Sequence, residues 1–433
     1  MRSLIATMSV ATLISSLATA ADWPQWRGPT RDEKSAEIGL NKAFGTKAPP
    51  VAWKFAKAGI GYSGPSIASG KVYLVGGTAK DKDSDKHQDE AICLDEKSGK
   101  ELWRVAIGGE YVDNGSDKNW GGGPRANPTV TVDGHVYFLG IRGDVYCLKA
   151  DDGKLVWTKN YTKDFGGKLM SGWGFSESPL VDGDSIICTP GGAKGTIVAL
   201  DRKTGATKWQ SAELKDDAAY SSIVRAKLAG VEQYVTLTGK AVAGVAVDTG
   251  KLLWRYDCGD KYKVAVIPTA VIAGPDLVYA TAGYGAGCDL IKITGDASGL
   301  KAEKVFANKD VVNHHGGVIF KDGFIYGHSD TKGWVCQDLK DGSLKWEWKR
   351  GGFEKGAVTY ADGALFCYGE NSGDLVVLEA TTEGPKQIGS LKLPERTKLL
   401  RKSGKAWAHP VIANGKLYLR DQDLLYCFDL SSK

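Results

Sequence analysis

The chain contains 433 residues, carries a formal net charge of +5 and includes 56 glycines and eight cysteines. Its lysines and acids are interleaved without the basic block that nucleic-acid binding requires, which argues against a nucleic-acid partner. The glycine content indicates a chain rich in tight turns.

The first twenty residues, MRSLIATMSVATLISSLATA, have the pattern of a secretory signal peptide. A positive charge at Arg2 precedes an apolar stretch that ends in Ala18-Thr19-Ala20, a cleavage site of small residues. The stretch is too short and too rich in Ser and Thr for a membrane anchor. Because the first cysteine is Cys93, none directly follows the cleavage site to carry a lipid. We expect cleavage after Ala20 and an exported, soluble protein, periplasmic or extracellular.

After the signal peptide (1–20), we assign residues 21–48 to an N-terminal extension and 49–433 to a repeat domain. The segment PPVAWKFAK, 49–57, predicts a lone strand that carries Trp53. It precedes the first complete repeat and has no partner in the neighbouring sequence.

A turn centred on glycine recurs eight times between apolar strands, as in IASGKVYLV and VIANGKLYL. The mean spacing is about 49 residues, within the range of β-propeller blades. The strands alternate apolar with polar or aromatic residues, which is typical of half-buried β-structure. The turn glycines are Gly70, Gly134, Gly183, Gly230, Gly274, Gly323, Gly363 and Gly415.

A second hairpin follows most of these turns, as in ALDRKTGATKW, where an Asp-Gly turn leads into a strand that ends in tryptophan. Gly tolerates the positive φ of such a turn, and Asp bonds its own backbone two residues on. The tryptophans, which we expect to dock each blade on its neighbour, are Trp103, Trp157, Trp209, Trp254 and Trp346. Degenerate copies place Phe306 and Ile388 at this position.

Each unit therefore predicts four antiparallel strands, A to D, and the last unit, ending at LYCFDLSSK, lacks strand D. If the strand around Trp53 supplies it, the ring closes and no sheet edge remains exposed. The sequence thus predicts an all-β, eight-bladed β-propeller closed by its N- and C-terminal strands in one blade. Two β-sandwiches in tandem are the alternative, which eight similar units with a split last unit disfavour.

The cysteines are single, without CxxC spacing. Cys93, Cys147, Cys336 and Cys427 are expected in C strands, and Cys188 and Cys367 in B strands, where a cysteine is commonly a small core residue. Export would allow oxidation. Cys258 and Cys288 fall outside that pattern and are the first pair to test.

The A–B and C–D turns are tight, whereas the B–C loops and D-to-A connections carry nearly all the irregular sequence and form the candidate working face. Two interpretations of the residues expected at the channel mouth stay open: a ligand site, or the polar lining of a wide, wet channel. These residues are Tyr62, Arg125, Asn127, Trp173, Glu177, Tyr220, Lys263, His314, His315, Lys355, Trp407 and His409.

Three other motifs carry less weight. Asp81, Asp83 and Asp85 imitate the start of a calcium loop but lack its glycine and closing glutamate, which indicates a solvated charge run. GGAKG at 191–195 lacks the GK[ST] of a phosphate-binding loop and predicts a B–C loop. Adjacent histidines, His314-His315, would point opposite ways on a strand, which disfavours joint metal binding.

The repeat ALDRKTGATKW and its relatives resemble the tryptophan-docking repeats of the pyrroloquinoline-quinone (PQQ) propeller superfamily, over nearly the whole mature chain. The start ADWPQWRGPTRD resembles that of exported bacterial members. The resemblance implies one of two functions. Quinoprotein alcohol dehydrogenases bind PQQ and usually calcium in the channel, whereas the outer-membrane assembly protein BamB has no cofactor and binds protein partners.

The sequence departs from both branches. It has neither the adjacent cysteines of methanol-dehydrogenase-like members nor a CxxCH haem site, and it lacks the lipid-attachment cysteine of BamB. We expect a non-catalytic binding or scaffold protein of the cell envelope, without metal or cofactor. It would be a monomer that binds an envelope protein or a small molecule on the B–C/D–A face.

The alternative is a PQQ-dependent alcohol or sugar dehydrogenase. The resemblance would then imply that Arg125 and Lys263 hold the PQQ carboxylates and that Trp173 or Trp407 stacks on its ring. Glu177 and Asn127 would ligate calcium through oxygen, which suits a hard cation.

Overall fold

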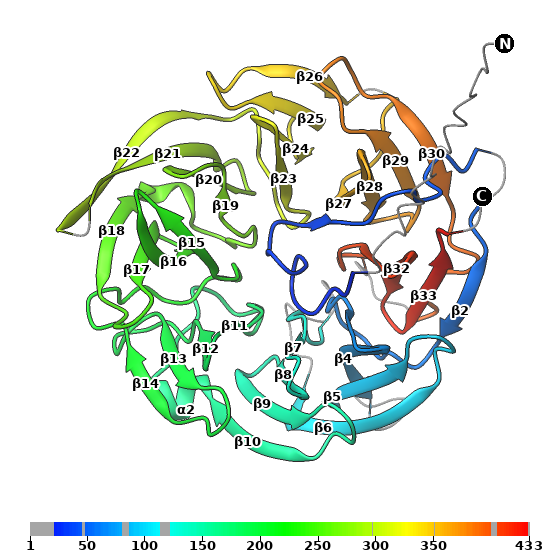
Figure 1. Cartoon of the computed structure of the whole chain (residues 1–433), viewed down its shortest axis with the longest axis horizontal. Helices are drawn as coiled ribbons and strands as arrows, with labels where there is room; N and C mark the ends of the chain where they lie inside the picture. The colour runs from blue at the N-terminus through cyan, green and yellow to red at the C-terminus, as the bar shows by residue number, and fades with distance from the viewer. Residues whose placement is uncertain are drawn as a thin grey trace, which may run out of the picture.

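A computed structural model describes residues 21–45, 48–79, 86–112, 122–296, 298–349, 351–399 and 405–431. The proposed signal peptide and the run Asp81, Asp83, Asp85 lie outside these residues. Within them the chain forms a disc of eight β-sheets around a central axis (Figure 1). The predicted eight-bladed β-propeller is confirmed.

Blades 1 to 4 each contain four consecutive antiparallel strands. Their strands are β3 (Ser66–Ala68), β4 (Lys71–Ala79), β5 (Lys86–Asp95) and β6 (Glu101–Val112); β7 (Thr129–Val130), β8 (His135–Leu139), β9 (Asp144–Lys149) and β10 (Leu155–Asn160); β11 (Leu180–Asp182), β12 (Ser185–Cys188), β13 (Val198–Asp201) and β14 (Thr207–Gln210); and β15 (Val224–Leu228), β16 (Val231–Leu237), β17 (Ala241–Ala246) and β18 (Leu252–Asp257).

Blades 5 to 7 repeat this order, and blade 8 combines both ends of the chain. Their strands are β19 (Val271–Ile272), β20 (Leu277–Ala282), β21 (Gly287–Asp296) and β22 (Gly299–Asn308); β23 (Val318–Lys321), β24 (Phe324–Ser329), β25 (Gly333–Asp338) and β26 (Leu344–Trp348); β27 (Gly356–Ala361), β28 (Ala364–Gly369), β29 (Leu375–Glu379) and β30 (Gln387–Leu391); and β31 (Val411–Ala413), β32 (Lys416–Asp421) and β33 (Leu424–Asp429) with β2 (Val51–Phe55). The helical elements described are α2 (Tyr161–Phe165) and a 3-10 turn, Gly259–Lys261.

The closing strand pairs as the sequence predicts. Strand β2 lies antiparallel to β33, with Trp53 opposite Cys427 and Phe55 opposite Leu425. Trp53 is buried in an apolar cluster that joins blades 8 and 1. The two ends of the chain thereby complete one blade and close the ring.

Apolar packing lies between successive blades. The described residues form eight apolar clusters, and each joins the facing sides of two neighbouring blades. All eight cysteines are buried in the structure as free thiols, so Cys258 and Cys288 are not bonded to each other. Cys288 in fact lies in a C strand, β21, like four of the others.

At several of its positions the recurring tryptophan contacts the following blade. Trp157 of blade 2 donates its indole N–H to the carbonyl of Arg202, in the C–D turn of blade 3, at 2.9 Å. A Cβ on Gly205 of that turn would lie 2.8 Å from the indole, so a glycine is required there. Trp53, Trp103 and Trp346 donate in the same way to the following blade. Trp254 differs, because it bonds Gln233 of its own blade.

Blade 1 departs from the loops expected in its sequence. Much of GGTAKDKDSDKHQDE belongs to strands β4 and β5, which pair from Lys71↔Asp95 to Ala79↔His87. Strand β6 continues to Val112, into the connection expected as irregular. Residues 86–90 are all polar, but their burial alternates along the strand, and backbone pairing extends the hairpin beyond the blade core.

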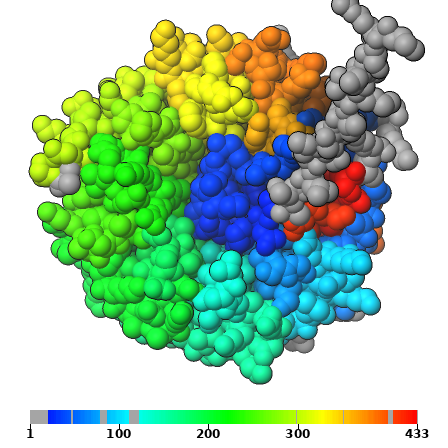
Figure 2. Space-filling model, in the orientation of Figure 1, coloured from blue at the N-terminus to red at the C-terminus, as the bar shows by residue number. Residues whose placement is uncertain are grey.

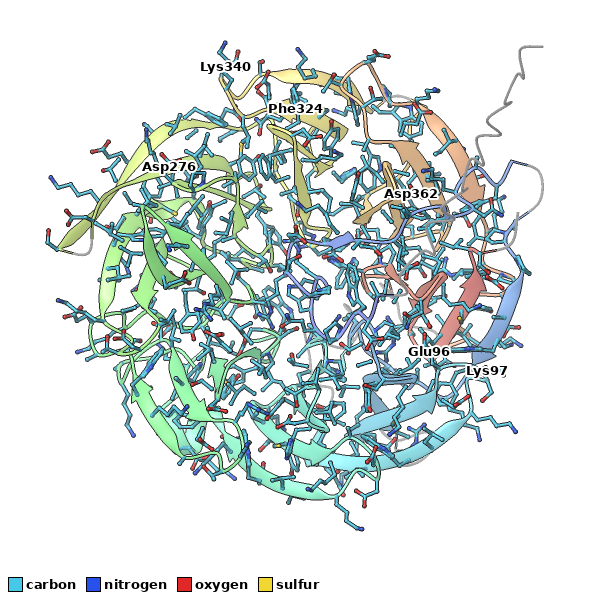
Figure 3. The ribbon with its side chains drawn as sticks, in the orientation of Figure 1. Glu96, Lys97, Asp276, Phe324, Lys340 and Asp362 are labelled. Atoms are coloured by element: carbon cyan, nitrogen blue, oxygen red, sulfur yellow. The ribbon has the colours of Figure 1, made fainter. Side chains whose placement is uncertain are left out.

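The N-terminal extension lies across the centre of the ring. We call residues 22–45 the plug; in Figure 2 it is the dark blue segment at the centre of the disc. Its strand β1 (Lys34–Ser35) adds to β27 in parallel. It crosses the face of the A–B turns, where Asp22 accepts a hydrogen bond from Ser69 N and Glu37 from Gly415 N. Figure 3 views the same face, with turn residues such as Lys340 at the rim.

The plug contacts every blade. Buried polar side chains anchor it, since Arg27 pairs with Glu33 at 3.1 Å and Arg31 donates to carbonyls at the start of the neighbouring blades 3 and 4. In blade order, the contacts are Trp23 with Ile67, Pro24 with Val130, Arg31 with Ser178, Arg31 with Ile223, Trp26 with Thr269, Arg27 with Val318, Glu33 with Thr359, and Asn41 with Leu430. The wide, wet channel of the sequence interpretation is therefore closed at one face.

Candidate functional site

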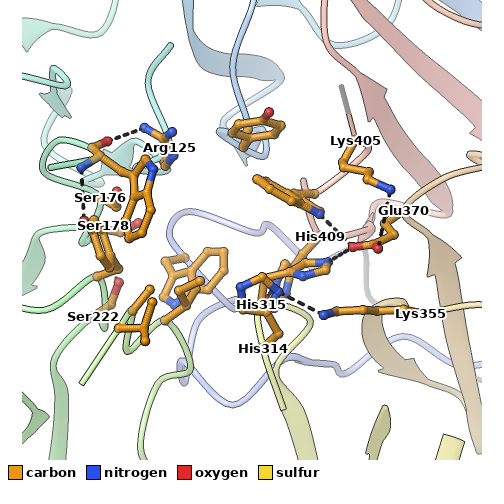
Figure 4. A pocket seen from close by; sticks show the side chains of 18 of the residues that line it. Arg125, Ser176, Ser178, Ser222, His314, His315, Lys355, Glu370, Lys405 and His409 are labelled. Carbon is orange, nitrogen blue, oxygen red and sulfur yellow. Dashed lines mark hydrogen bonds and ion pairs between the residues drawn. The ribbon is translucent and has the colours of Figure 1, made fainter. Parts of the chain in front are cut away.

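A cavity of about 530 Å³ lies above the plug, at the end of the ring formed by the D-to-A connections. Trp26 of the plug contributes to its lining. The cavity is thus a cup, closed by the N-terminal extension and lined on its sides by successive blades. Figure 4 shows Lys355, Lys405 and Glu370 on one side and Arg125, Ser176 and Ser178 on the other.

Nine of the twelve residues expected at the channel mouth line this cup. The connections between blades bring them together because each ends near the axis. They are Tyr62, Arg125, Trp173, Tyr220, His314, His315, Lys355, Trp407 and His409.

Three expected residues lie elsewhere. Asn127 is buried and accepts a hydrogen bond from Gly64 N at 2.8 Å. Glu177 is buried beside Tyr161 and accepts from Thr189 N at 2.9 Å. Lys263 is exposed and pairs with Asp260. Asn127 comes two residues after Arg125, and Glu177 stands between Ser176 and Ser178, so their side chains point into the blade walls while these neighbours line the cup.

Ten lining residues were not singled out from the sequence. The aromatic start ADWPQWRG could have indicated Trp26, and assignment of B–C loops to the working face could have indicated Tyr284 and Glu370. The small and apolar members carry no such signal. The ten are Trp26, Ser176, Ser178, Ser222, Val264, Ala265, Ile267, Tyr284, Glu370 and Lys405.

Aromatic rings supply much of the wall. Tyr62 and Trp407 lie with ring centroids 4.8 Å apart, and Trp26 lies 4.6 Å from His409. The Arg125 guanidinium lies over the Tyr62 ring, 5.5 Å from its centroid, and donates to the Trp173 carbonyl at 2.6 Å. Such walls favour flat, apolar groups in a ligand.

Cations outnumber carboxylates in the cup. Glu370 accepts from the Trp407 indole N–H at 2.8 Å and lies 3.8 Å from the Lys405 ammonium. Lys355 and Arg125 add two further positive charges. His314 and His315 stay neutral at pH 7, because burial lowers the pKa of His314 to about 4 and that of His315 well below its usual value. The site is therefore electropositive.

His314 and His315 both reach the cup, contrary to the expectation for a strand. Their segment is a bend, and the rings lie 5.4 Å apart at 84°. Both ring nitrogens of His315 are buried without a hydrogen-bond partner among the described residues. His315 lies 3.6 Å from Glu370, too far for a strong bond.

The residues assigned to calcium do not fit a metal site. The Glu177 carboxylate faces Tyr161 and Thr189 in the blade wall, and burial raises its pKa. Asn127 holds a backbone amide instead. Among the described ranges, no group of three His, Cys, Asp or Glu side chains is placed to hold a metal ion. The cations and aromatic walls suit an anionic ring compound. Glu177 and Asn127, however, do not form the calcium site that the quinoprotein alternative requires.

The eight four-stranded blades, the tryptophan docking and the central cup define a PQQ-like β-propeller. A family model described as "Outer membrane protein assembly factor BamB" matches residues 87–348, more than half of the chain. The chain belongs to this family. No curated protein matches the sequence.

Solved structures share the fold at low identity. A quinohemoprotein alcohol dehydrogenase from Comamonas testosteroni is 13% identical with a TM-score of 0.62, covering 97% of this chain and 82% of that chain. A europium-containing methanol dehydrogenase is 11% identical with a TM-score of 0.64, covering 92% and 89%. The computationally designed Ika8 protein is 10% identical with a TM-score of 0.56, covering 87% and 100%. At these identities the similarity shows the fold alone.

No helix among the described residues has the length and apolar character needed to cross a lipid bilayer.

Proposed function

We propose that this chain is a non-catalytic binding protein of the cell envelope, exported by its first twenty residues, whose central cup holds a small organic ligand. One observation carries the proposal: the plug closes the channel at the A–B turn face and leaves an aromatic-walled cup of about 530 Å³ at the other. That volume and lining are typical of small-molecule sites.

The enzymatic alternative has weaker support. Arg125, Trp173 and Trp407 line the cup as that alternative requires, but Lys263, Asn127 and Glu177 do not. We therefore derive no reaction step through PQQ or calcium. A calorimetric titration of the mature protein with PQQ, with and without calcium, tests this choice; tight, calcium-dependent binding would overturn the non-catalytic proposal.

A pair of Val→Trp variants tests the ligand site. Val264 lines the cup, whereas Val132 is fully exposed in the blade 2 A–B turn, away from it. Small molecules that co-purify with the protein from its native envelope fraction are extracted and compared by mass spectrometry. We expect a compound retained by the wild type and by Val132→Trp but lost from Val264→Trp. Identical small-molecule profiles in all three proteins would contradict the ligand site.

Family membership supports a second candidate, a protein partner that docks on the same B–C/D–A face. Val264 and Tyr284 are large apolar residues exposed at the cup and available to such a partner. Affinity capture from envelope extracts at near-physiological salt tests it with the same variants. A protein captured by the wild type and Val132→Trp but not by Val264→Trp would support docking there.

A further inference from the structure

Tyr284 occupies a strained position at the cup. It lies in the tight B–C turn between β20 and β21 with φ of 55°, a left-handed conformation that non-glycine residues rarely adopt. Its neighbours permit the position: Gly285 has φ of 77°, and a Cβ on Gly283 would lie 3.0 Å from the His314 Cα. Such backbone strain is commonly retained at functional positions.

A chain of polar contacts leads from the blade wall to this tyrosine. Asp330 pairs with the Lys355 ammonium at 2.7 Å. Lys355 Nζ lies 2.9 Å from His314 Nδ1, a contact that is dashed in Figure 4. His314 Nε2 lies 3.0 Å from the Tyr284 hydroxyl.

The chemistry of these groups fixes the direction of each hydrogen bond. A lysine ammonium only donates, so His314 Nδ1 must accept. The neutral imidazole then carries its proton on Nε2 and donates it to the Tyr284 oxygen. The phenolic proton of Tyr284 is consequently not used in this series of contacts, and the described residues show no second hydrogen bond to this hydroxyl.

The protonation states agree with that direction. Burial, and then the Lys355 charge, lowers the pKa of His314 to about 4. Burial, and then Asp330, raises the pKa of Tyr284. At pH 7 the imidazole is neutral and the phenol keeps its proton.

We propose that Tyr284 is a hydrogen-bond donor to the ligand of the cup, and that Lys355 is a positioning residue that directs the Tyr284 proton outward through His314. The ligand would carry a carbonyl or carboxylate oxygen on a flat, apolar body. The aromatic walls, including Trp26 and Trp407, contact the flat body, and Tyr284 donates its hydroxyl proton to the ligand oxygen. This inference rests on the proposed function, since it requires a small ligand in the cup.

A second observation, at His315, also indicates that the cup holds a polar ligand group. It is buried and lines the cup, and both its ring nitrogens lack a hydrogen-bond partner among the described residues. A buried polar group without a partner is costly, so a ligand group or a water is expected at it.

Two neutral fluorescent probes test the donor. Prodan is a naphthalene ketone whose emission moves to the red when its carbonyl accepts a hydrogen bond, whereas N-phenyl-1-naphthylamine is a naphthalene with an added phenyl ring and no carbonyl. We expect Tyr284→Phe to weaken prodan binding by about 2- to 10-fold, the range of one hydrogen bond, and to shift its bound emission to the blue. Binding of N-phenyl-1-naphthylamine should not change.

The positioning role of Lys355 needs a double-mutant cycle. Without the Lys355 ammonium, His314 can carry its proton on Nδ1 and accept a hydrogen bond from Tyr284 at Nε2. The Tyr284 proton is then no longer free for the ligand, so Lys355→Met should weaken prodan binding and shift its emission as Tyr284→Phe does. The double variant should show no further loss. Lys154→Met, at an exposed lysine outside the cup, is the charge control and should match the wild type.

The outcomes separate the two proposals. If neither probe binds the wild type, or if Val264→Trp affects neither, the ligand site itself fails. If both probes bind in the cup but Tyr284→Phe leaves the affinity and emission of prodan unchanged, the donor role alone is wrong. Additive losses in the double variant would refute the relay through His314.

Discussion

At the residue scale, blade docking depends on a glycine as much as on a tryptophan. Gly205 has φ of 72° and leaves room for the Trp157 indole of the preceding blade. Gly99, Gly153 and Gly250 stand against Trp53, Trp103 and Trp209 in the same way. The repeated Asp-Gly turn is therefore both a chain reversal and the surface on which the neighbouring blade packs.

Replacing this glycine should destabilise the protein more than replacing a glycine of an open turn. Gly205→Ala places a methyl group 2.8 Å from the indole of Trp157, whereas Gly230, with φ of 80°, has no atom within 4 Å of a built Cβ. Both variants incur the left-handed penalty of about 1–2 kcal/mol, and the clash adds about 1–3 kcal/mol to Gly205→Ala. Urea denaturation measures both. Equal losses would show that the turn glycine has no docking role.

Buried histidines make stability fall as the solution becomes acidic. Burial lowers the pKa of His328 to about 4, below its unfolded value near 6.5. Between these values the unfolded chain binds the proton and the folded chain does not, so stability is full above pH 6.5 and is lost as pH falls toward 4. His314 is shifted in the same direction, also to about 4.

The variant His328→Gln isolates one such group. Its free energy of unfolding should approach that of the wild type as pH falls, by about 2 kcal/mol between pH 7 and pH 5. Denaturation at both pH values gives the difference. A constant difference between the two proteins would mean that folded His328 titrates near its ordinary pKa.

At the scale of the element, strand β2 closes the ring. Trp53 is buried between blades 8 and 1, and Lys54 on the same strand points outward to Glu395. Trp53→Ala should cost about 3–5 kcal/mol through lost apolar contacts, and deletion of 49–57 should lower the melting temperature further. Lys54→Ala, which removes only an exposed ion pair, should melt like the wild type. If the deleted protein also melts like the wild type, the closure is unimportant for stability.

At the scale of the whole molecule, the plug contributes both to the stability of the ring and to the lining of the cup. Its hydrogen bonds and packing reach all eight blades, and the Glu33–His409 contact spans 376 residues of sequence. The same segment contributes Trp26 to the ligand site. Ring stability and ligand binding should therefore depend together on residues 22–45.

Deleting residues 22–45 should lower the melting temperature, because the buried contacts of Arg27, Arg31 and Glu33 are lost. It should also abolish probe binding, because the plug closes the cup. A synthetic peptide of the same sequence, added in excess, should restore part of both. A scrambled peptide is the control. An unchanged melting temperature and unchanged prodan affinity in the deleted protein would show that the plug is dispensable.

The blades themselves were predictable because their signals are local. Turn glycines recur at a regular spacing, apolar residues alternate along the strands, and a tryptophan marks the outer strand of six of the eight blades. The last unit lacks one strand and the strand around Trp53 lacks a partner, so the sequence also predicted that these two ends close the ring. These patterns need only the chemistry of turns and the two-residue period of a strand.

The site followed from the sequence only in part. Nine residues of the D-to-A connections were placed at the cup because every such connection ends near the axis. Asn127 and Glu177 fell into the wall, since one or two residues along a connection change which way a side chain points. The bend at His314-His315, which lets both rings reach the cup, has no two-residue period by which to recognise it.

By itself, then, the sequence determined the eight blades, their docking and their closure, which depend on neighbours within one or two repeats. The tertiary structure alone decided that the extension plugs the channel, that a cup remains, and that Lys355 faces Tyr284 through His314. The physical reason is the range of the contacts. Buried ion pairs and hydrogen bonds between segments hundreds of residues apart leave no periodic trace along the chain.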